Sequence, residues 1–332
     1  MSPSSLDSAV FGLFSTHALD LAIRHGVFSH LIEQTSADAE SIARARGIDA
    51  DTTERLLLVL AAASVLDRGA DGTYRVAPGT VPYVDPASSR YLGEFVSHLV
   101  ANTAGQLSLL DDYLRRGKAA ADVGRPAVFD GIYRDEESTR AFLEAMWQLS
   151  YEPSKELVAL AQLADVRRLV DVGGASGAFA VAALAEYSGL RAAVFDLPQV
   201  APHLDRVRHD RGLTDRLEFV PGDFFQDELP AADCLSFGYI LSDWEDGTCL
   251  GLLEKAYRAC APGGRVLVLE RLFDEQGGPL PTAVMNLSMH VETQGRHRTG
   301  AEYTALLEKA GFTDCSVHRS SWDKHLVIGR KP

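Results

Sequence analysis

A glycine-rich turn after a short apolar run is the feature that most constrains the fold of this chain. The run at 169–172 contains one acid, Asp171, and glycines follow at positions 173, 174 and 177. The apolar segment 178–184 that comes next has the composition of a helix. Glycine lets the backbone adopt positive φ values and pass close to a ligand. The segment therefore predicts a strand, a tight turn and a helix beside a nucleotide-like group.

A second acid supports this interpretation, because Asp196 ends the next predicted strand at 191–196. It follows the glycine turn by about 20 residues, which suits a carboxylate that binds ribose hydroxyls. The order Gly173-Gly174-x-x-Gly177 differs from the Gly-x-Gly-x-x-Gly of dinucleotide sites. It suits a cofactor without a pyrophosphate, such as S-adenosylmethionine (SAM). A plain strand-to-helix turn is the alternative.

The C-terminal half alternates between predicted strands and helices, which is typical of a mostly parallel sheet with helices on both faces. A helix at about 300–310 and a final hairpin follow the predicted strands 167–172, 191–196, 216–221, 233–238 and 264–270. Ligands of such sheets bind beyond the carboxyl ends of the strands. The acids near those ends are therefore expected to converge: Asp171, Asp196, Asp223, Asp243 and Glu270.

The N-terminal part predicts a helical unit with a winged-helix pattern. Apolar side chains recur at helical spacing over residues 9–33, and short helices are predicted at 37–45 and 51–66. The turn at 71–72 then joins two short strands. Because the second short helix is mostly Leu and Ala and no basic stripe is present, we expect a dimerisation unit and not DNA binding.

Composition disfavours several classes of partner. A formal net charge of −14 over 332 residues argues against general affinity for nucleic acid or an anionic membrane. No apolar run of membrane-spanning length and no signal peptide is expected. The four cysteines form no C-x-x-C pair and are expected to be reduced. These features predict a cytoplasmic protein that acts on a small molecule.

Six motifs in order make the chain resemble SAM-dependent small-molecule O-methyltransferases of the plant caffeate and bacterial polyketide type. The motifs lie at 171–177, 195–200, 222–225, 243–244, 262–264 and 295–299. The resemblance covers nearly the whole chain and implies a homodimer. It implies three domains: an all-helical, winged-helix dimerisation domain at 1–88, a helical linker and substrate-pocket region at 89–163, and an α/β, Rossmann-like SAM-binding methyltransferase domain at 164–332.

The resemblance also implies which residues contact SAM. Asp196 would accept hydrogen bonds from the ribose hydroxyls, while Asp223 and Phe224 would bind the amine and the ring of adenine. The full implied set is Asp171, Gly173, Asp196, Leu197, Gly222, Asp223 and Phe224.

Two departures from the family pattern concern the catalytic residues. The family has a histidine base directly before Asp-Trp, whereas this chain has Ser242, whose hydroxyl is too weak a base for a phenol near neutral pH. The family's glutamate in Gly-Arg-Glu-Arg-Thr, which helps to orient that histidine, is His297 here. In addition, His290 stands where ordinary O-methyltransferases have an apolar residue. In these positions the chain resembles bacterial 2-oxo acid C-methyltransferases of peptide-antibiotic pathways.

This second resemblance predicts metal-assisted C-methylation. His290, Asp243 and Glu270 would bind a divalent metal, with zinc, iron, manganese and nickel as candidates. The metal would chelate a small 2-oxo acid and stabilise the enolate formed at the carbon next to the keto group. His297 is the candidate base, and Ser242 would act only through a bound water.

Each of these residues has a structural alternative. His290 could be a core histidine and Asp243 a helix cap. Glu270 could orient a catalytic histidine or pair with an arginine, and His297 could belong to a surface turn. Apolar side chains are predicted to line the acceptor pocket, with a place in the core as the alternative: Phe142, Met146, Trp147 and Met289.

Two other functions stay open at this point. One is metal-independent O-methylation of a phenolic or hydroxylated natural product, which needs only binding and orientation if the acceptor is already ionised. The other is SAM binding without catalysis, which the loss of the family base would allow.

Overall fold

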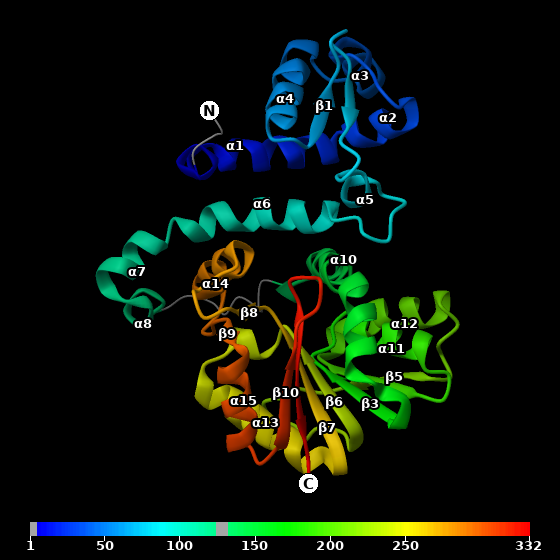
Figure 1. Cartoon of the computed structure of the whole chain (residues 1–332), viewed down its shortest axis with the longest axis vertical. Coiled ribbons are helices and arrows are strands. Elements are labelled where there is room, and N and C mark those ends of the chain that lie inside the picture. Colours follow the sequence, from blue (N-terminus) through cyan, green and yellow to red (C-terminus); the bar gives the residue numbers. More distant parts are fainter. Residues whose placement is uncertain (1–4, 124–131) are drawn as a thin grey trace. The chain divides into compact units, whose positions relative to one another are not determined.

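The computed structural model describes residues 5–123 and 132–332 (Figure 1). The chain divides into two compact units, Met1–Ala104 and Gly105–Pro332. The first unit contains the predicted winged-helix pattern, and the second contains the predicted α/β segment. The three-domain division drawn from the sequence stays a prediction.

The first unit is helical with one short hairpin. Its elements are α1 (Ser5–Arg24), α2 (Val27–Gln34), α3 (Ala39–Arg46), α4 (Ala50–Ala62), β1 (Leu66–Arg68), β2 (Tyr74–Val76), α5 (Val81–Val84) and α6 (Gly93–Leu107), the last of which continues past Ala104. Asp38 and Asp49 begin α3 and α4 by accepting hydrogen bonds from the backbone N–H groups of Ser41 at 2.7 Å and Thr52 at 2.8 Å. The antiparallel pairing of β1 with β2 confirms the predicted hairpin.

The second unit is built on a seven-stranded sheet in the order β10-β11-β7-β6-β3-β4-β5. The strands are β3 (Arg168–Val172), β4 (Arg191–Asp196), β5 (Leu217–Pro221), β6 (Ala232–Gly238), β7 (Cys260–Glu270), β10 (Thr313–His318) and β11 (His325–Arg330). Strands β3 to β7 are parallel, while β11 runs antiparallel to both β7 and β10. The five predicted strands and the final hairpin are therefore confirmed.

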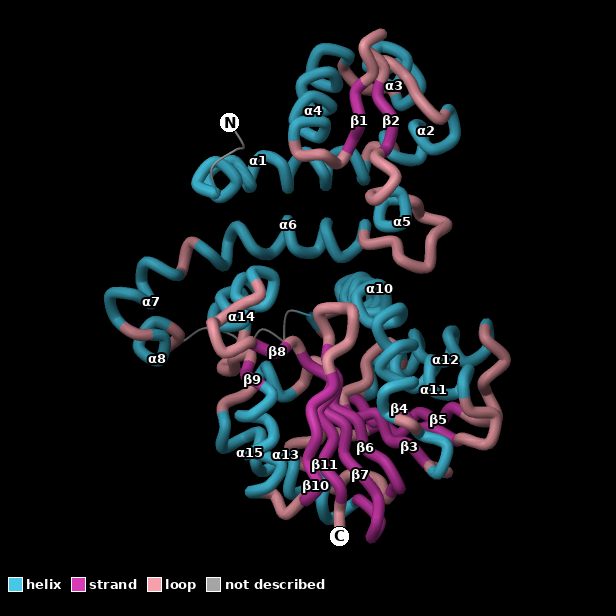
Figure 2. Tube along the Cα trace, viewed as in Figure 1, coloured by secondary structure: helices cyan, strands magenta, loops and turns pink. Residues whose placement is uncertain are grey.

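Helices lie on both sides of this sheet (Figure 2). The helices whose side chains pack on the sheet are α10 (Glu136–Ala161), α11 (Ala178–Glu186) and α12 (Ala201–Asp210) on one face and α13 (Asp246–Ala259) and α15 (Gly300–Lys309) on the other. The second unit also contains α7 (Leu110–Arg116), α8 (Lys118–Ala121) and α14 (Leu280–Glu292). A small parallel pair, β8 (Leu272–Phe273) with β9 (Arg298–Thr299), accompanies them. This architecture confirms the predicted α/β, Rossmann-like fold.

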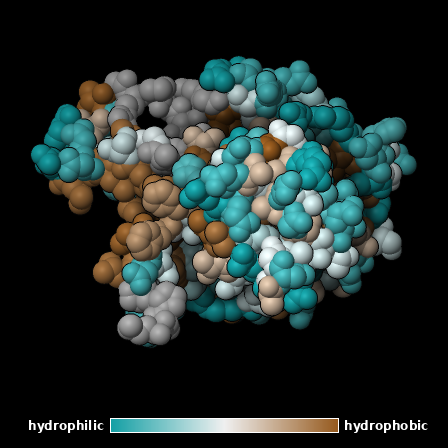
Figure 3. All heavy atoms as spheres, turned by 90° about the horizontal axis from the view of Figure 1, so that it is seen from above, coloured by the Kyte–Doolittle hydropathy of each residue, from teal (hydrophilic) through white to brown (hydrophobic). Residues whose placement is uncertain are grey.

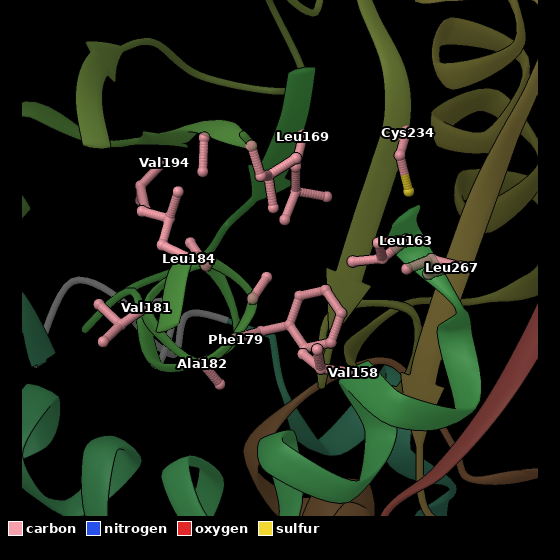
Figure 4. Close-up of a cluster of buried hydrophobic side chains, with 14 of the residues drawn as sticks. Val158, Leu163, Leu169, Phe179, Val181, Ala182, Leu184, Val194, Cys234 and Leu267 are labelled. Atoms are coloured by element: carbon pink, nitrogen blue, oxygen red, sulfur yellow. The ribbon is translucent and has the colours of Figure 1, made fainter. Parts of the chain in front are cut away.

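Two hydrophobic clusters fill the space on either face of the sheet. Successive side chains of a strand point to opposite faces, so Leu169 packs with Phe179 of α11 while Val170 packs with Leu253 of α13. Figure 4 shows Leu169, Phe179 and Val194 in the first cluster. Burial of the central strands on both faces holds their carboxyl ends in a fixed relation to one another.

Helix α1 departs from one expectation. Among the described helices, its segment Leu6–Arg24 is long and apolar enough to cross a membrane by length and composition alone. A sequence reading for long apolar runs misses it, because Asp7 and Asp20 interrupt the pattern. Asp20 accepts hydrogen bonds from Arg24 Nε at 2.9 Å and Ser97 Oγ at 2.7 Å within the first unit. One such helix near an N-terminus is weak support for a membrane span.

Candidate active site

A cavity of about 390 Å³ lies at the carboxyl ends of the parallel strands. The glycine turn after β3 forms one of its walls. Gly173 has φ 63°, and a Cβ added there would lie 2.5 Å from Ile240 Cδ1. Only glycine meets both conditions without strain, which explains the residue type at this position.

All seven predicted cofactor contacts are among the residues that line this cavity: Asp171, Gly173, Asp196, Leu197, Gly222, Asp223 and Phe224. They come from the carboxyl ends of β3 and β4 and from the loops that follow β3, β4 and β5. The sheet order places these loops side by side. Their individual roles toward a cofactor stay proposals.

Asp196 is held by its neighbours in an orientation that suits a ribose. Its Oδ2 accepts a hydrogen bond from Ala175 N and its Oδ1 from Leu197 N, both at 2.7 Å. Burial raises the pKa of this carboxyl to about 6, although the two backbone hydrogen bonds oppose the shift. Each carboxylate oxygen can accept a further hydrogen bond, which fits a pair of hydroxyls.

Asp171 is anchored from the neighbouring strand. Ser236 Oγ of β6 donates to Asp171 Oδ1 at 2.6 Å. Burial raises the pKa of Asp171 to about 6, while the Ser236 hydrogen bond and the charge of Lys324 act in the opposite direction. The carboxyl group of Asp171 can therefore accept a hydrogen bond from a cationic group bound at the glycine turn.

Aromatic side chains supply the apolar surface of the cavity. Phe225 makes edge contacts with Phe224 and with Trp244, each with ring centres 4.7 Å apart. Tyr133 and Phe142 line the cavity as well, with ring centres 6.2 Å apart. An adenine ring and an aromatic acceptor both find flat apolar partners here. The glycine cradle, the acids and the rings together fit SAM.

Asp243 lines the cavity from the turn Leu241–Asp243. Burial raises the pKa of the Asp243 carboxyl well above its usual range, and the negative charges of Glu270 and Glu292 raise it further. Glu270 is fully buried at the end of β7, and its Oε1 accepts a hydrogen bond from Ser242 N at 3.1 Å. Burial raises the pKa of Glu270 to about 7.

Arg298 fixes the turn that carries Asp243. This arginine is fully buried, and it donates to Leu241 O and to Trp244 O, both at 2.8 Å. It also donates to Asp246 Oδ1 at 2.9 Å and 2.7 Å from two of its nitrogens. The motif at 295–299 thus positions the turn at 241–244, a role that its sequence alone does not reveal.

The comparisons with known proteins agree with this geometry. The O-methyltransferase domain profile matches residues 108–313. Acetylserotonin O-methyltransferase of Bos taurus is 32% identical over 329 residues, covering 96% of this chain and 95% of the bovine protein. This chain belongs to the O-methyltransferase family. It is a SAM-dependent methyltransferase, as the resemblance in its motifs predicts.

Two further comparisons support membership of this family. The 3-hydroxy-5-methyl-1-naphthoate 3-O-methyltransferase of Streptomyces sahachiroi is 31% identical over 319 residues, covering 96% of this chain and 91% of that protein. The crystal structure of human N-acetylserotonin methyltransferase with SAM superposes with a TM-score of 0.89 at 29% identity, covering 100% of this chain and 99% of the human chain. SAM binding without catalysis is thereby set aside.

The prediction of metal-assisted C-methylation of a 2-oxo acid for peptide-antibiotic biosynthesis is wrong. The relatives are named as O-methyltransferases acting on acetylserotonin and a hydroxynaphthoate. The resemblance to C-methyltransferases rested on three positions, Ser242, His290 and His297. Three changed positions carry less weight than similarity along the whole chain.

The predicted metal site is not formed either. His290 is exposed on α14 and makes an edge contact with Tyr113, with ring centres 5.7 Å apart. Glu270 is fully buried under the turn at 241–243, where it accepts from Ser242 N. Among the described residues, no group of three or more His, Cys, Asp or Glu side chains could hold a metal ion.

Ser242 and His297, two other predicted catalytic residues, are not among the described residues that line the cavity. Ser242 is buried, and its backbone N–H donates a hydrogen bond to Glu270 Oε1. His297 is 3% exposed, and neither ring nitrogen has a hydrogen-bond partner among the described residues. Burial, with the positive charges of Arg271 and Arg298, lowers the pKa of His297 to about 4. The ring is therefore neutral near pH 7 and resists protonation.

The predicted acceptor residues divide into two pairs. Phe142 and Met146 of α10 line the cavity. Trp147 instead stacks on Tyr151, with ring centres 4.5 Å apart, and Met289 is likewise absent from the described lining. The sequence reading missed Lys324, Ser150 and Tyr239, which line the cavity as well. A signal for Lys324 exists only in the tertiary structure, because it lies outside every motif.

Proposed function

We propose that this enzyme transfers the methyl group of SAM to a hydroxyl oxygen of a small aromatic molecule. The relatives that support this act on hydroxyl-bearing aromatic compounds by name. The cavity of this chain offers aromatic and thioether surface from Tyr133, Phe142 and Met146. Such a lining favours a flat, largely apolar acceptor.

The position of Asp243 is the observation that carries the proposed mechanism. A general base must come within hydrogen-bond reach of the proton that it removes. Of the four residues predicted to act in catalysis, only Asp243 is among the described lining residues of the cavity. Its raised pKa brings the carboxyl closer to the pH at which an enzyme works.

In the proposed reaction, removal of the hydroxyl proton accompanies transfer of the methyl group. Asp243 accepts the hydroxyl proton of the acceptor as the acceptor oxygen forms its bond to the methyl carbon. When bound, SAM supplies that methyl on a cationic sulfur, which keeps the electron pair of the broken bond. The cavity walls hold oxygen and methyl in line, which contributes much of the rate.

His297 is the runner-up as base. A protonated His297 would face the charges of Arg271 and Arg298, which disfavour it. Ser242 has no such role, because its hydroxyl is too weakly basic. We therefore assign proton removal to Asp243.

The test is the pH dependence of methyl transfer from labelled SAM to acetylserotonin and to 3-hydroxy-5-methyl-1-naphthoate. In the wild type, kcat/KM rises with pH until Asp243 is ionised. Asp243→Asn lowers kcat by roughly 10²- to 10⁴-fold and removes this rise. Glu245→Gln, which changes an exposed neighbouring carboxyl, keeps kcat within about twofold. A collapse of activity in His297→Gln with an active Asp243→Asn would refute the assignment.

The proposal includes a homodimer in the cytoplasm. Helix α1 leaves large apolar side chains exposed in the isolated chain: Leu6, Val10, Phe11, Leu13 and Phe14. In Figure 3, apolar side chains, coloured brown, gather on one part of the surface. A patch of this kind marks an interaction surface. All four cysteines are free, in keeping with a reducing compartment.

A further inference from the structure

The cavity contains a buried cation that the proposed mechanism does not use. Lys324 is 3% exposed and is the only lysine or arginine among the described lining residues. Its Nζ donates to Ser150 Oγ at a long 3.5 Å and lies 4.0 Å from the centre of the Tyr239 ring. An ammonium group has three donors. Two of these donors have no hydrogen-bond partner among the described residues, so the ammonium group can donate hydrogen bonds to a ligand.

The chain holds Lys324 firmly in this position through the loop between β10 and β11. Ser320 Oγ donates to Lys324 O at 2.6 Å. Ser321 N donates to Glu156 Oε1 at 2.8 Å, which ties the same loop to α10. Gly238 leaves room for the ammonium group, since a Cβ added there would lie 3.2 Å from Nζ. A binding group held in this way loses little entropy when a ligand arrives.

The surroundings keep this lysine charged. Burial and the charge of Arg271 lower the pKa of Lys324 to about 8, while the carboxylates of Glu270 and Asp171 oppose the shift. The protonated form therefore predominates at pH 7. A buried ammonium group with few hydrogen bonds is costly unless an anion completes its surroundings.

The order of the strands indicates which part of the cofactor would lie near Lys324. From β5 to β6 the strands run β5, β4, β3, β6, and they carry Asp223, Asp196, the glycine turn and Gly238 in that order. Neighbouring strands lie about 4.8 Å apart. Asp223 and Asp196 stand at the end proposed for adenine and ribose. Lys324, beside Gly238, stands at the opposite end, where the amino-acid part of the cofactor must lie.

We propose that Lys324 Nζ and Ser150 Oγ form the subsite for the carboxylate of the amino-acid part of the cofactor. That part carries one ammonium and one carboxylate group. Asp171 and the glycine turn offer acceptors to the ammonium group, and Lys324 supplies the charge that matches the carboxylate. Lys324 lies beyond residues 108–313, so the O-methyltransferase domain profile does not include it.

Calorimetric titration with two ligands tests this subsite, and it needs no acceptor or turnover. S-adenosylhomocysteine carries the carboxylate, and 5′-methylthioadenosine is the same nucleoside without the amino-acid part. Lys324→Met weakens binding of S-adenosylhomocysteine by roughly 10- to 100-fold, as expected for a charge-assisted hydrogen bond. It leaves binding of 5′-methylthioadenosine within about twofold, because that ligand never reaches the ammonium group.

Two more variants complete the experiment. Ser150→Ala keeps the buried charge of Lys324. It weakens the binding of S-adenosylhomocysteine by roughly three- to tenfold and leaves the binding of 5′-methylthioadenosine unchanged. Lys309→Met, an exposed lysine in the last turn of α15, changes neither affinity. Equal losses for both ligands in Lys324→Met would mean that Lys324 only maintains the cavity, and unchanged affinities for both would mean that the carboxylate binds elsewhere. Either result overturns the subsite. A failure of Asp243 as base would leave these affinities untouched.

Discussion

Asp196 shows how one residue can combine burial with binding. It is 7% exposed, and its raised pKa comes from that burial. The backbone N–H groups of Ala175 and Leu197 orient the carboxylate from both sides. The ionised form accepts hydrogen bonds from two hydroxyls, whereas the protonated form loses part of that capacity. Protonation of this group therefore contributes to the pH dependence of cofactor affinity.

The sign of the pH effect follows from the raised pKa. As the pH falls through about 6, Asp196 takes up a proton in the empty site, and binding of S-adenosylhomocysteine weakens. Asp196→Asn binds roughly 10- to 100-fold more weakly at pH 8. Between pH 7 and 5 it loses the part of the further weakening that comes from Asp196 and keeps the part that comes from Asp171, whose pKa is also raised to about 6. Calorimetry over this pH range measures both effects. Asp210→Asn, an exposed acid of α12, should follow the wild-type curve. A wild-type affinity that does not change across pH 6 would contradict this role.

At the scale of elements, the turn at 241–243 depends on a segment more than fifty residues away. β9 begins with Arg298, whose guanidinium satisfies two carbonyls of the turn and caps Asp246 at the start of α13. The neighbouring Gly295 packs directly against the backbone of Ser242 and Asp243. The motif at 295–299 therefore acts as a support for the turn that presents Asp243.

Replacing Arg298 removes that support. We expect Arg298→Met to lower the free energy of unfolding by roughly 2–4 kcal/mol, because the carbonyls of Leu241 and Trp244 lose their guanidinium donor. Urea denaturation followed by circular dichroism measures the change. Arg296→Met is the matched control, because Arg296 is 46% exposed and pairs with Asp246 and Glu302 at the surface. That variant should stay within about 0.5 kcal/mol of the wild type. Equal stabilities for the two variants would argue against the support role.

At the scale of the whole molecule, the exposed apolar face of α1 is the surface on which the proposed homodimer depends. Phe14 is 69% exposed and Leu13 is 63% exposed. Burying two such patches against each other in a second copy would release apolar surface from water on both chains. This is the physical support for the proposed homodimer.

A single charge in that patch should break the dimer. Light scattering after size-exclusion chromatography should give a dimer for the wild type and a monomer, or a dimer weakened by roughly tenfold or more, for Phe14→Glu. Leu58→Glu introduces the same charge on α4, where Leu58 is 42% exposed, and should leave the dimer intact. A monomeric wild type, or a Phe14→Glu variant as dimeric as the wild type, would remove the basis for this interface.

The sequence by itself determined the succession of the main strands and helices along the chain and a set of seven residues that come together at one end of the sheet. These follow from local causes: apolar runs bounded by turns, a glycine whose φ is 63°, and acids placed where parallel strands end. The seven predicted cofactor residues consequently line one cavity. Helix α1 shows the limit of such reading, because the pattern indicates a helix but not what covers its apolar face.

Only the tertiary structure decided which acids and cations face the cavity. His290 and Glu270 have the residue types of a metal site, yet one is exposed on α14 while the other is buried under the turn at 241–243. Lys324 has no motif around it, yet pairing of β11 with β7 brings its loop to the cavity. The direction of a side chain depends on contacts between segments far apart along the chain, and residue types and spacing do not record those contacts.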